Sequence, residues 1–232
     1  MASLGQRALT WCDQWNQAHP WDHNAHHHRW IERQLPARIG TALDVGCGTG
    51  ELARRLSARA GHVTGLDVDP ASIETARRLT RGQDNGQDRG RGEVDFYCED
   101  LLSADLPGGY DVITALAVLH HLPLEPALSR LRDLLAPGGT LVVLGLYREQ
   151  TPSDHLLSTA AIPANLLVGT VKTLQRGSSR PPIAMSAPTA PASTSLREIR
   201  EVARRQVPGA VLRRHLFWRY SLRYTAALQG DR

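Results

Sequence analysis

The sequence has little lysine and little cysteine. Lys172 is the only lysine, so arginine supplies nearly all of the positive charge. The three cysteines, Cys12, Cys47 and Cys98, form no Cys-x-x-Cys pair and no metal-ligand spacing. A sparse, odd set of cysteines argues against a disulfide framework and is typical of a reducing compartment. The first residues also lack a cationic start followed by a long apolar run, so we predict no signal peptide and expect the protein in the cytoplasm.

Long apolar runs are also missing. Residues 156–174 carry a single charge, but Pro163, Asn165 and several hydroxyl side chains make this stretch too polar for a membrane span. We interpret it as buried helices and predict no stable membrane insertion, an interfacial helix being the less favoured alternative. The net charge of +4 is scattered, with no basic stripe, which argues against nucleic acid as a partner.

What the chain does contain is an alternation of short apolar strands and helical patterns. Its 232 residues, 41% of them hydrophobic, are enough for one α/β domain with a core of its own. Alternating buried strands and helices predicts βαβ units around a parallel sheet. Near the end, a helical pattern is followed by two β-like runs that predict a hairpin. We expect strands at 41–45, 62–66, 94–98, 110–116, 140–146, 210–216 and 220–226, and helices at 51–60, 70–79, 125–135 and 196–206.

The organisation predicted from these patterns is a single domain spanning residues 1–232. Residues 1–38 are expected to form a helical lid, and residues 39–149 the cofactor-binding core. The alternation stops at residues 150–195, which are read as an insertion that caps the substrate. Residues 196–228 are expected to supply the final helix and the hairpin.

A glycine-rich turn follows the first predicted strand, in the run from Asp44 through Gly46, Cys47 and Gly48 to Gly50. Glycine allows a sharp strand-to-helix turn and lets the backbone pass close to a ligand. A dinucleotide fingerprint would place a small residue at position 51, where this chain has a glutamate. An acidic first helical turn opposes a pyrophosphate, so the motif favours a ligand without phosphates and disfavours a nicotinamide dehydrogenase.

Acidic residues follow the next two predicted strands. Asp67 ends the second strand, 21 residues after Gly46 (67 − 46), a spacing suited to an acid that accepts hydrogen bonds from a ribose. Asp100 follows the third strand, where its carboxylate could accept from an adenine amino group while the Leu101 amide donates to a ring nitrogen. Each acid alone reads equally well as a solvated loop residue. Together they predict a ligand site at the carboxyl edge of the sheet.

These motifs, with Tyr110-Asp-Val-Ile, Leu119-His-His-Leu and Leu135-Ala-Pro-Gly-Gly, resemble those of class I S-adenosylmethionine (SAM)-dependent methyltransferases. They are most similar to the group related to the ubiquinone and menaquinone C-methyltransferases. The resemblance covers about residues 40–146 and implies a doubly wound α/β fold: a seven-stranded, mostly parallel sheet with the last strand antiparallel, and an N-terminal helical lid. It also implies SAM as the cofactor, held by Asp44, Gly46, Cys47, Gly48, Asp67, Val68, Asp100, Leu101 and Ala117, with Arg29 or His28 at its carboxylate.

The acceptor side is less defined by sequence. His120 and His121 follow the fourth strand, and either is a candidate catalytic base; the alternative is that one packs against or caps the next helix. In the N-terminal segment, His26 and Trp21 are expected to line the acceptor pocket, together with Trp218 near the end of the chain. The histidine-rich run at 19–30 also has metal-like spacing, but no further ligands complete a site, so we predict no metal.

The leading hypothesis is therefore methyl transfer to a C, O or N atom of a small-molecule metabolite, the acceptor being partly hydrophobic to match the apolar insertion. One alternative is a SAM-binding protein that transfers no methyl group, since a fold does not determine its chemistry. A macromolecule methyltransferase is less favoured, because no basic stripe or added binding domain is present. The sequence leaves the acceptor, the methylated atom and the oligomeric state open.

Overall fold

The computed structural model describes residues 23–82, 91–151, 192–215 and 219–228. The chain divides into two compact units, one formed by residues 24–148 and 185–232 and the other by residues 1–23 and 149–184. Nearly all of the described residues belong to the first unit.

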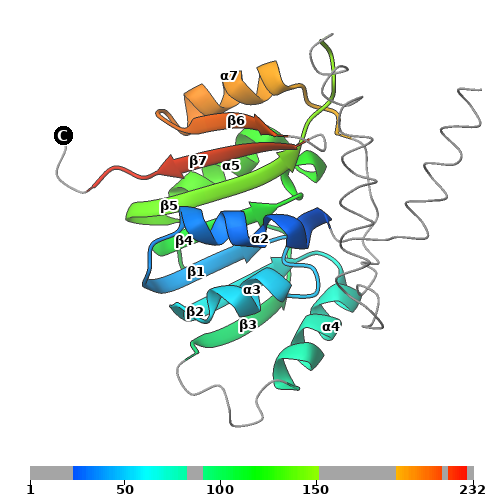
Figure 1. Ribbon diagram of the computed structural model, residues 1–232, viewed down its shortest axis with the longest axis vertical. Coiled ribbons are helices and arrows are strands. Elements are labelled where there is room, and N and C mark those ends of the chain that lie inside the picture. The colour runs from blue at the N-terminus through cyan, green and yellow to red at the C-terminus, as the bar shows by residue number, and fades with distance from the viewer. Residues whose placement is uncertain (1–22, 83–90, 152–191, 216–218, 229–232) are drawn as a thin grey trace, which may run out of the picture. The chain divides into compact units, whose positions relative to one another are not determined.

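The first unit is built on one seven-stranded sheet in the order β3-β2-β1-β4-β5-β7-β6 (Figure 1). All neighbouring pairs from β3 to β5 are parallel, whereas β7 runs antiparallel to both β5 and β6. This confirms the predicted mostly parallel sheet, its antiparallel last strand and the closing hairpin. The strands are β1 (Ile39–Val45), β2 (Ala60–Asp67), β3 (Glu93–Cys98), β4 (Tyr110–Leu116), β5 (Leu135–Leu146), β6 (Val211–His215) and β7 (Arg219–Thr225).

The strand order reverses next to β1. From β1 the chain adds β2 and β3 on one side, then returns to place β4 on the other side of β1. In doubly wound sheets, ligands bind in the crevice outside the carboxyl edge at such a reversal, so a ligand is expected between the diverging loops that leave β1 and β4. The predicted glycine turn and the predicted acids all lie along this edge.

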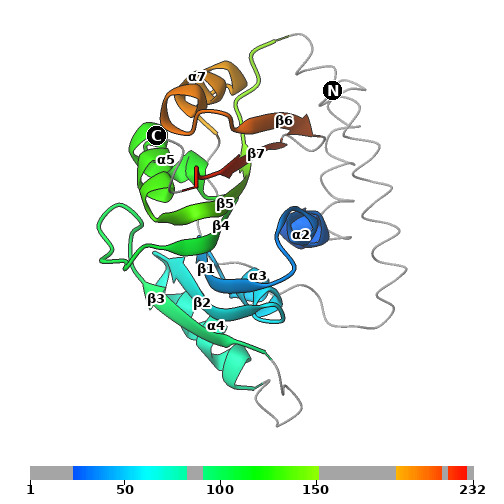
Figure 2. The same ribbon diagram turned by 90° about the vertical axis from the view of Figure 1, so that its left-hand side faces the viewer.

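Side chains of the buried strands alternate between the two faces of the sheet, so both faces are apolar. Helices cover each face and form two hydrophobic cores with it. Ala42 of β1 contributes to the core on one face of the sheet, and its neighbour Leu43 contributes to the core on the opposite face. Figure 2 shows α2 and α3 on one side of the sheet and α5 and α7 on the other. The helices on the face of Ala42 are α2 (His23–Gln34), α3 (Glu51–Leu56) and α4 (Pro70–Arg81). Those on the face of Leu43 are α5 (Leu124–Asp133) and α7 (Leu196–Gln206), with the short 3-10 helix η1 (Leu119–His121).

Two predicted boundaries are wrong by more than two residues. The helix expected at 51–60 ends at Leu56, because Ala60 already pairs with Ile39 as the first residue of β2. Gly61 therefore lies within a strand and does not end a helix. The strand expected at 140–146 begins at Leu135, which pairs with Tyr110, and the register shifts between this pair and the next. That irregularity accommodates Pro137, which cannot donate a ladder hydrogen bond.

The described part of the predicted N-terminal lid packs onto the sheet. Ile31 and Leu35 of α2 are buried in the core on that face, and Trp30 packs against it. Glu32 joins α2 to α3, since its carboxylate accepts a hydrogen bond of 2.6 Å from Arg55 Nε. The described part of this segment is therefore an amphipathic helix with Ile31 turned inward and Trp30 partly buried; residues 1–22 lie outside the described chain. None of the helices described is long and apolar enough to cross a membrane.

Candidate functional site

The glycine turn after β1 passes close to β2 and to the loop after β4. Gly46, Gly48 and Gly50 have φ values of 67°, 53° and 77°, a conformation that costs little only for glycine. The N–H groups of Gly46 and Cys47 both donate to the Leu66 carbonyl, at 2.7 and 3.0 Å. A Cβ on Gly46 would lie 2.7 Å from Val118 Cβ, so a side chain there would collide with the loop after β4. The turn is therefore a backbone surface pressed into the crevice at the strand-order reversal.

Asp67, at the end of β2, holds this turn in place. One of its carboxylate oxygens accepts a hydrogen bond of 2.8 Å from the Gly48 N–H, and the other accepts one of 2.9 Å from the Asp69 N–H. Asp67 is only partly buried, and each carboxylate oxygen has capacity for a further donor. The residue predicted to bind a ribose thus also links two loops of the site.

Asp44 is buried beneath the turn, with 2% of its surface exposed. Its carboxylate accepts a hydrogen bond of 2.7 Å from the hydroxyl of Thr114, the residue that pairs with it across β1 and β4. Burial raises the pKa of Asp44 to about 6, while Thr114, His28 and the Ala53 N–H favour its charged form and Asp67 opposes it. Thr114 was not predicted, because its role follows from the strand register.

The first turn of α3 adds a third acid to the site. Glu51 Oε1 lies 3.4 Å from Nδ1 of His28, which is 4% exposed on α2. This contact is the largest of the causes that lower the pKa of Glu51. Arg29, the other residue predicted for the cofactor carboxylate, is exposed on α2. Of the two, His28 is the one in contact with the first turn of α3, directly after the glycine turn.

The ends of β2 and β3 lie side by side, as the predicted adenosine site requires. The Glu99 N–H donates to the Asp67 carbonyl at 3.0 Å. Asp100 accepts a hydrogen bond of 2.7 Å from the Leu102 N–H, whereas the Leu101 side chain is 2% exposed and packs in the core. Val68 is 65% exposed at this edge. An apolar side chain left in solvent next to a carboxylate suits the flat face of a base above it.

Phe96 of β3 was not predicted to belong to the site, but its ring packs against the glycine turn. A Cβ on Gly50 or on Gly65 would lie 2.5 Å from the ring of Phe96. The ring therefore fills the space that these two glycines leave, and it does so from β3. No sequence motif marks Phe96, since an aromatic residue inside a strand is most often plain core.

On the other side of the crevice, Ala117 and His120 follow β4. Ala117 has a φ of 56°, the only positive value among the described residues other than glycine, and such strain gathers at ligand sites. Val118, the next residue, contacts Gly46 as described. The predicted chain segment by the methionine end of the cofactor is thus in contact with the glycine turn.

His120 and His121 stack in η1 with their ring centroids 4.0 Å apart. His121 is exposed, and His120 is partly buried with its Nδ1 inaccessible and without a hydrogen-bond partner. Burial, then His121 and Arg219, lower the pKa of His120 to about 4. The imidazole is therefore neutral at neutral pH, the form that a base requires.

The structure does not describe the side chains of the three residues predicted to line the acceptor pocket. Trp21 and Trp218 lie outside the described residues, as does the side chain of His26. Among the residues that the structure does describe, no group of His, Cys, Asp or Glu could hold a metal ion.

The described edge fits SAM by its charge and by its backbone. SAM carries a sulfonium and an ammonium group but no phosphate, and Asp44, Glu51 and Asp67 place three carboxyl groups around the glycine turn. The same groups would repel a pyrophosphate. The buried Asp44 carboxyl is suited to an ammonium group, because it has one hydroxyl donor and little access to water.

Comparisons with known proteins agree with this geometry. A family model described as "Methyltransferase domain" matches residues 43–141. An uncharacterized methyltransferase of Mycobacterium tuberculosis is 32% identical over 212 residues, which cover 89% of this chain and 98% of that protein. A ubiquinone biosynthesis O-methyltransferase of Azotobacter vinelandii is 34% identical over 154 residues, covering 64% of this chain and 59% of that protein.

A solved structure of a SAM-dependent methyltransferase from Methanosarcina mazei shares the fold, with a TM-score of 0.59 and 16% identity over 86% of this chain and 98% of that one. Fold, relatives and site geometry lead to the same conclusion: the chain belongs to the class I SAM-dependent methyltransferases.

Proposed function

We propose that this protein binds SAM at the carboxyl edge of β1, β2 and β3 and transfers its methyl group to a small-molecule acceptor. The observation that carries the proposal is the hydrogen bond from Gly48 to Asp67, which joins the glycine turn to the predicted ribose acid. It brings two motifs that are 19 residues apart in sequence into one preformed cradle. A cradle that is already in place loses little entropy on binding.

In this proposal each residue has a role toward the cofactor. Gly46, Cys47 and Gly48 lie under its methionine part, and Asp44 accepts from its ammonium group. Asp67 accepts from the ribose hydroxyls, and Asp100 with Leu101 takes the adenine, stacked beside Val68. Bound SAM supplies an activated methyl group, since its sulfonium is a leaving group. The remaining work of the protein is alignment of the acceptor and exclusion of water.

His120 is the candidate for proton removal from the acceptor. It follows β4 on the side of the crevice that faces away from β2 and β3, and its imidazole is neutral. A base is needed only where the acceptor must lose a proton, as a hydroxyl group does. With a pKa of about 4 the His120 imidazole is a weak base, so it removes the proton as the bond to the methyl group forms and the acceptor proton becomes acidic.

Support for a small-molecule acceptor comes from the relatives and from charge. The Azotobacter protein is named an O-methyltransferase of ubiquinone biosynthesis, which is small-molecule metabolism. We propose an acceptor of that broad kind, partly hydrophobic, with the unplaced Trp21, His26 and Trp218 contributing to its pocket. The proposal includes cytoplasmic location and no nucleic-acid partner, in keeping with the scattered net charge.

The test has two stages. Calorimetric titration with SAM, S-adenosylhomocysteine and NAD should show binding of the first two only. Incubation with methyl-labelled SAM and a cell extract, separated afterwards into small molecules and macromolecules, should place the label in the small-molecule fraction. NAD binding without SAM binding would overturn the cofactor assignment. SAM binding with label in neither fraction would favour a protein that uses the cofactor without methyl transfer.

A further inference from the structure

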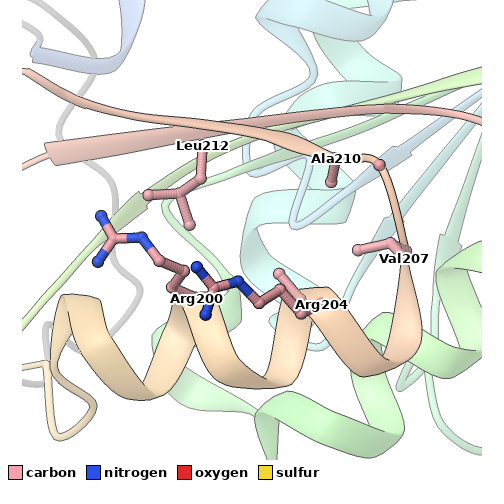
Figure 3. Close-up of a pocket in the computed structure, with 7 residues that line it drawn as sticks. Arg200, Arg204, Val207, Ala210 and Leu212 are labelled. Atoms are coloured by element: carbon pink, nitrogen blue, oxygen red, sulfur yellow. The ribbon is translucent and has the colours of Figure 1, made fainter.

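A groove between α7 and β6 carries two arginines and no acid. It has a volume of about 240 Å³ and is lined by Arg200, Ala203, Arg204, Val207, Gly209, Ala210 and Leu212. Figure 3 shows Arg200 and Arg204 rising from the same side of α7 beside the groove, with Leu212 of β6 facing them. The floor is apolar, because Ala203 and Val207 are buried.

The groove lies away from the cofactor edge. β6 runs parallel to β1 through β5, so its first residues and the preceding Gly209 lie at the amino edge of the sheet. The glycine turn and Asp67 lie at the carboxyl edge. Whatever occupies the groove therefore binds separately from the proposed cofactor.

The two arginines differ from their neighbours on α7. Arg197 pairs with Glu201 at 3.8 Å, and Arg205 pairs with Glu125 of α5 at 3.3 Å. Within the residues that the structure describes, the side chains of Arg200 and Arg204 make no ion pair and no hydrogen bond. Like charges four residues apart on a helix repel each other and destabilise the helix. An anion placed between the two guanidinium groups would turn this repulsion into a net attraction.

We propose that this groove binds a phosphorylated small molecule. Residues four apart on a helix have their Cβ atoms about 5–6 Å apart, so both guanidinium groups can reach one phosphate. Arginine matches phosphate with paired N–H donors, and one phosphate has enough oxygen atoms to accept hydrogen bonds from both guanidinium groups. Val207 and Leu212 then contact the organic part of the ligand. The volume suits a phosphate with a small ring or a short chain, and not a nucleotide.

Phenyl phosphate is the probe for the test, since it has a dianionic head and a compact apolar part. It is titrated calorimetrically into the full chain in a phosphate-free buffer of low salt. The double variant Arg200→Gln/Arg204→Gln should bind it at least tenfold more weakly than the unchanged protein. The matched control is Arg197→Gln/Arg213→Gln, which removes the same charge from exposed positions outside the groove and should stay within twofold.

Two further ligands separate the contribution of the arginines from that of the apolar floor of the groove. Inorganic phosphate should bind more weakly than phenyl phosphate, and phenol should not bind. Thermal unfolding and SAM titration of each variant establish that the fold and the cofactor site are intact. Absence of phenyl phosphate binding, equal weakening in the control variant, or phenol binding as tight as that of phenyl phosphate would overturn the proposal. None of these outcomes bears on methyl transfer.

Discussion

The two sides of the crevice at the sheet's carboxyl edge are built in different ways. On the side of β1 and β2, the described polar groups bind one another: Asp67 accepts from Gly48 and Asp69, and Asp44 accepts from Thr114. On the side of η1, His120 has a buried Nδ1 without a hydrogen-bond partner. The first side is held in place by backbone geometry before any ligand arrives. The second side presents a partly buried imidazole, that of His120, stacked on the exposed ring of His121.

The largest predicted effect breaks the preformed side. Gly46→Ala places a methyl group 2.7 Å from Val118 Cβ and also strains a backbone with a φ of 67°. We expect SAM affinity to fall more than about a hundredfold, since the loss of close approach exceeds roughly 2.7 kcal/mol. Calorimetric titration measures it. Gly109→Ala is the control, because Gly109 has a φ of 72° but nothing within 4 Å of a Cβ. Equal losses in both variants would mean that backbone strain alone, and not contact with Val118, matters.

A smaller effect is expected at the acid that joins the two loops. Asp67→Ala removes the acceptor of the Gly48 N–H and the proposed ribose contact. We expect SAM to bind about 1–3 kcal/mol more weakly, the range for a lost charge-assisted hydrogen bond. Asp105→Ala, an exposed carboxylate beyond β3, is the matched control. A dissociation constant unchanged by Asp67→Ala would show that the ribose lies elsewhere.

The smallest predicted effect is on the pH dependence of folding stability, to which one residue from each side, His120 and Asp44, contributes. The folded protein keeps His120 neutral down to a pKa of about 4, while the unfolded chain takes up that proton near 6.5, so His120 makes stability fall as pH drops through this window. Asp44 acts in the opposite sense: its pKa is about 6 when folded and 3.8 otherwise, so protonation favours the folded state as pH drops through that range.

Urea unfolding at pH 7, 5.5 and 4.5 tests this opposition. His120→Phe should flatten the loss of stability on acidification, and Asp44→Asn should steepen it. Each variant serves as the control for the other, since both remove a titrating group from the same edge. Equal slopes in the two variants and the unchanged protein would mean that neither group differs between folded and unfolded states.

Local patterns were enough to predict much of this molecule. Tyr110–Leu116 and Leu196–Gln206 have the predicted bounds. In each case chemistry at the ends sets the limits: Gly108 and Gly109 precede the strand, and a capping box of Ser195 with Glu198 starts the helix. Prediction failed at residues 57–60, where pairing with β1 overrode the helical pattern.

The sequence alone determined the glycine turn, Asp67 and Asp100, because the ends of consecutive parallel strands meet at one edge whatever the rest of the chain does. Only the tertiary structure decided that Thr114 supports Asp44, that Phe96 fills the space under Gly50 and Gly65, and that His28 approaches Glu51 where Arg29 does not. Those contacts depend on strand register and on the rotation of a helix, and both are set by packing between segments distant in sequence.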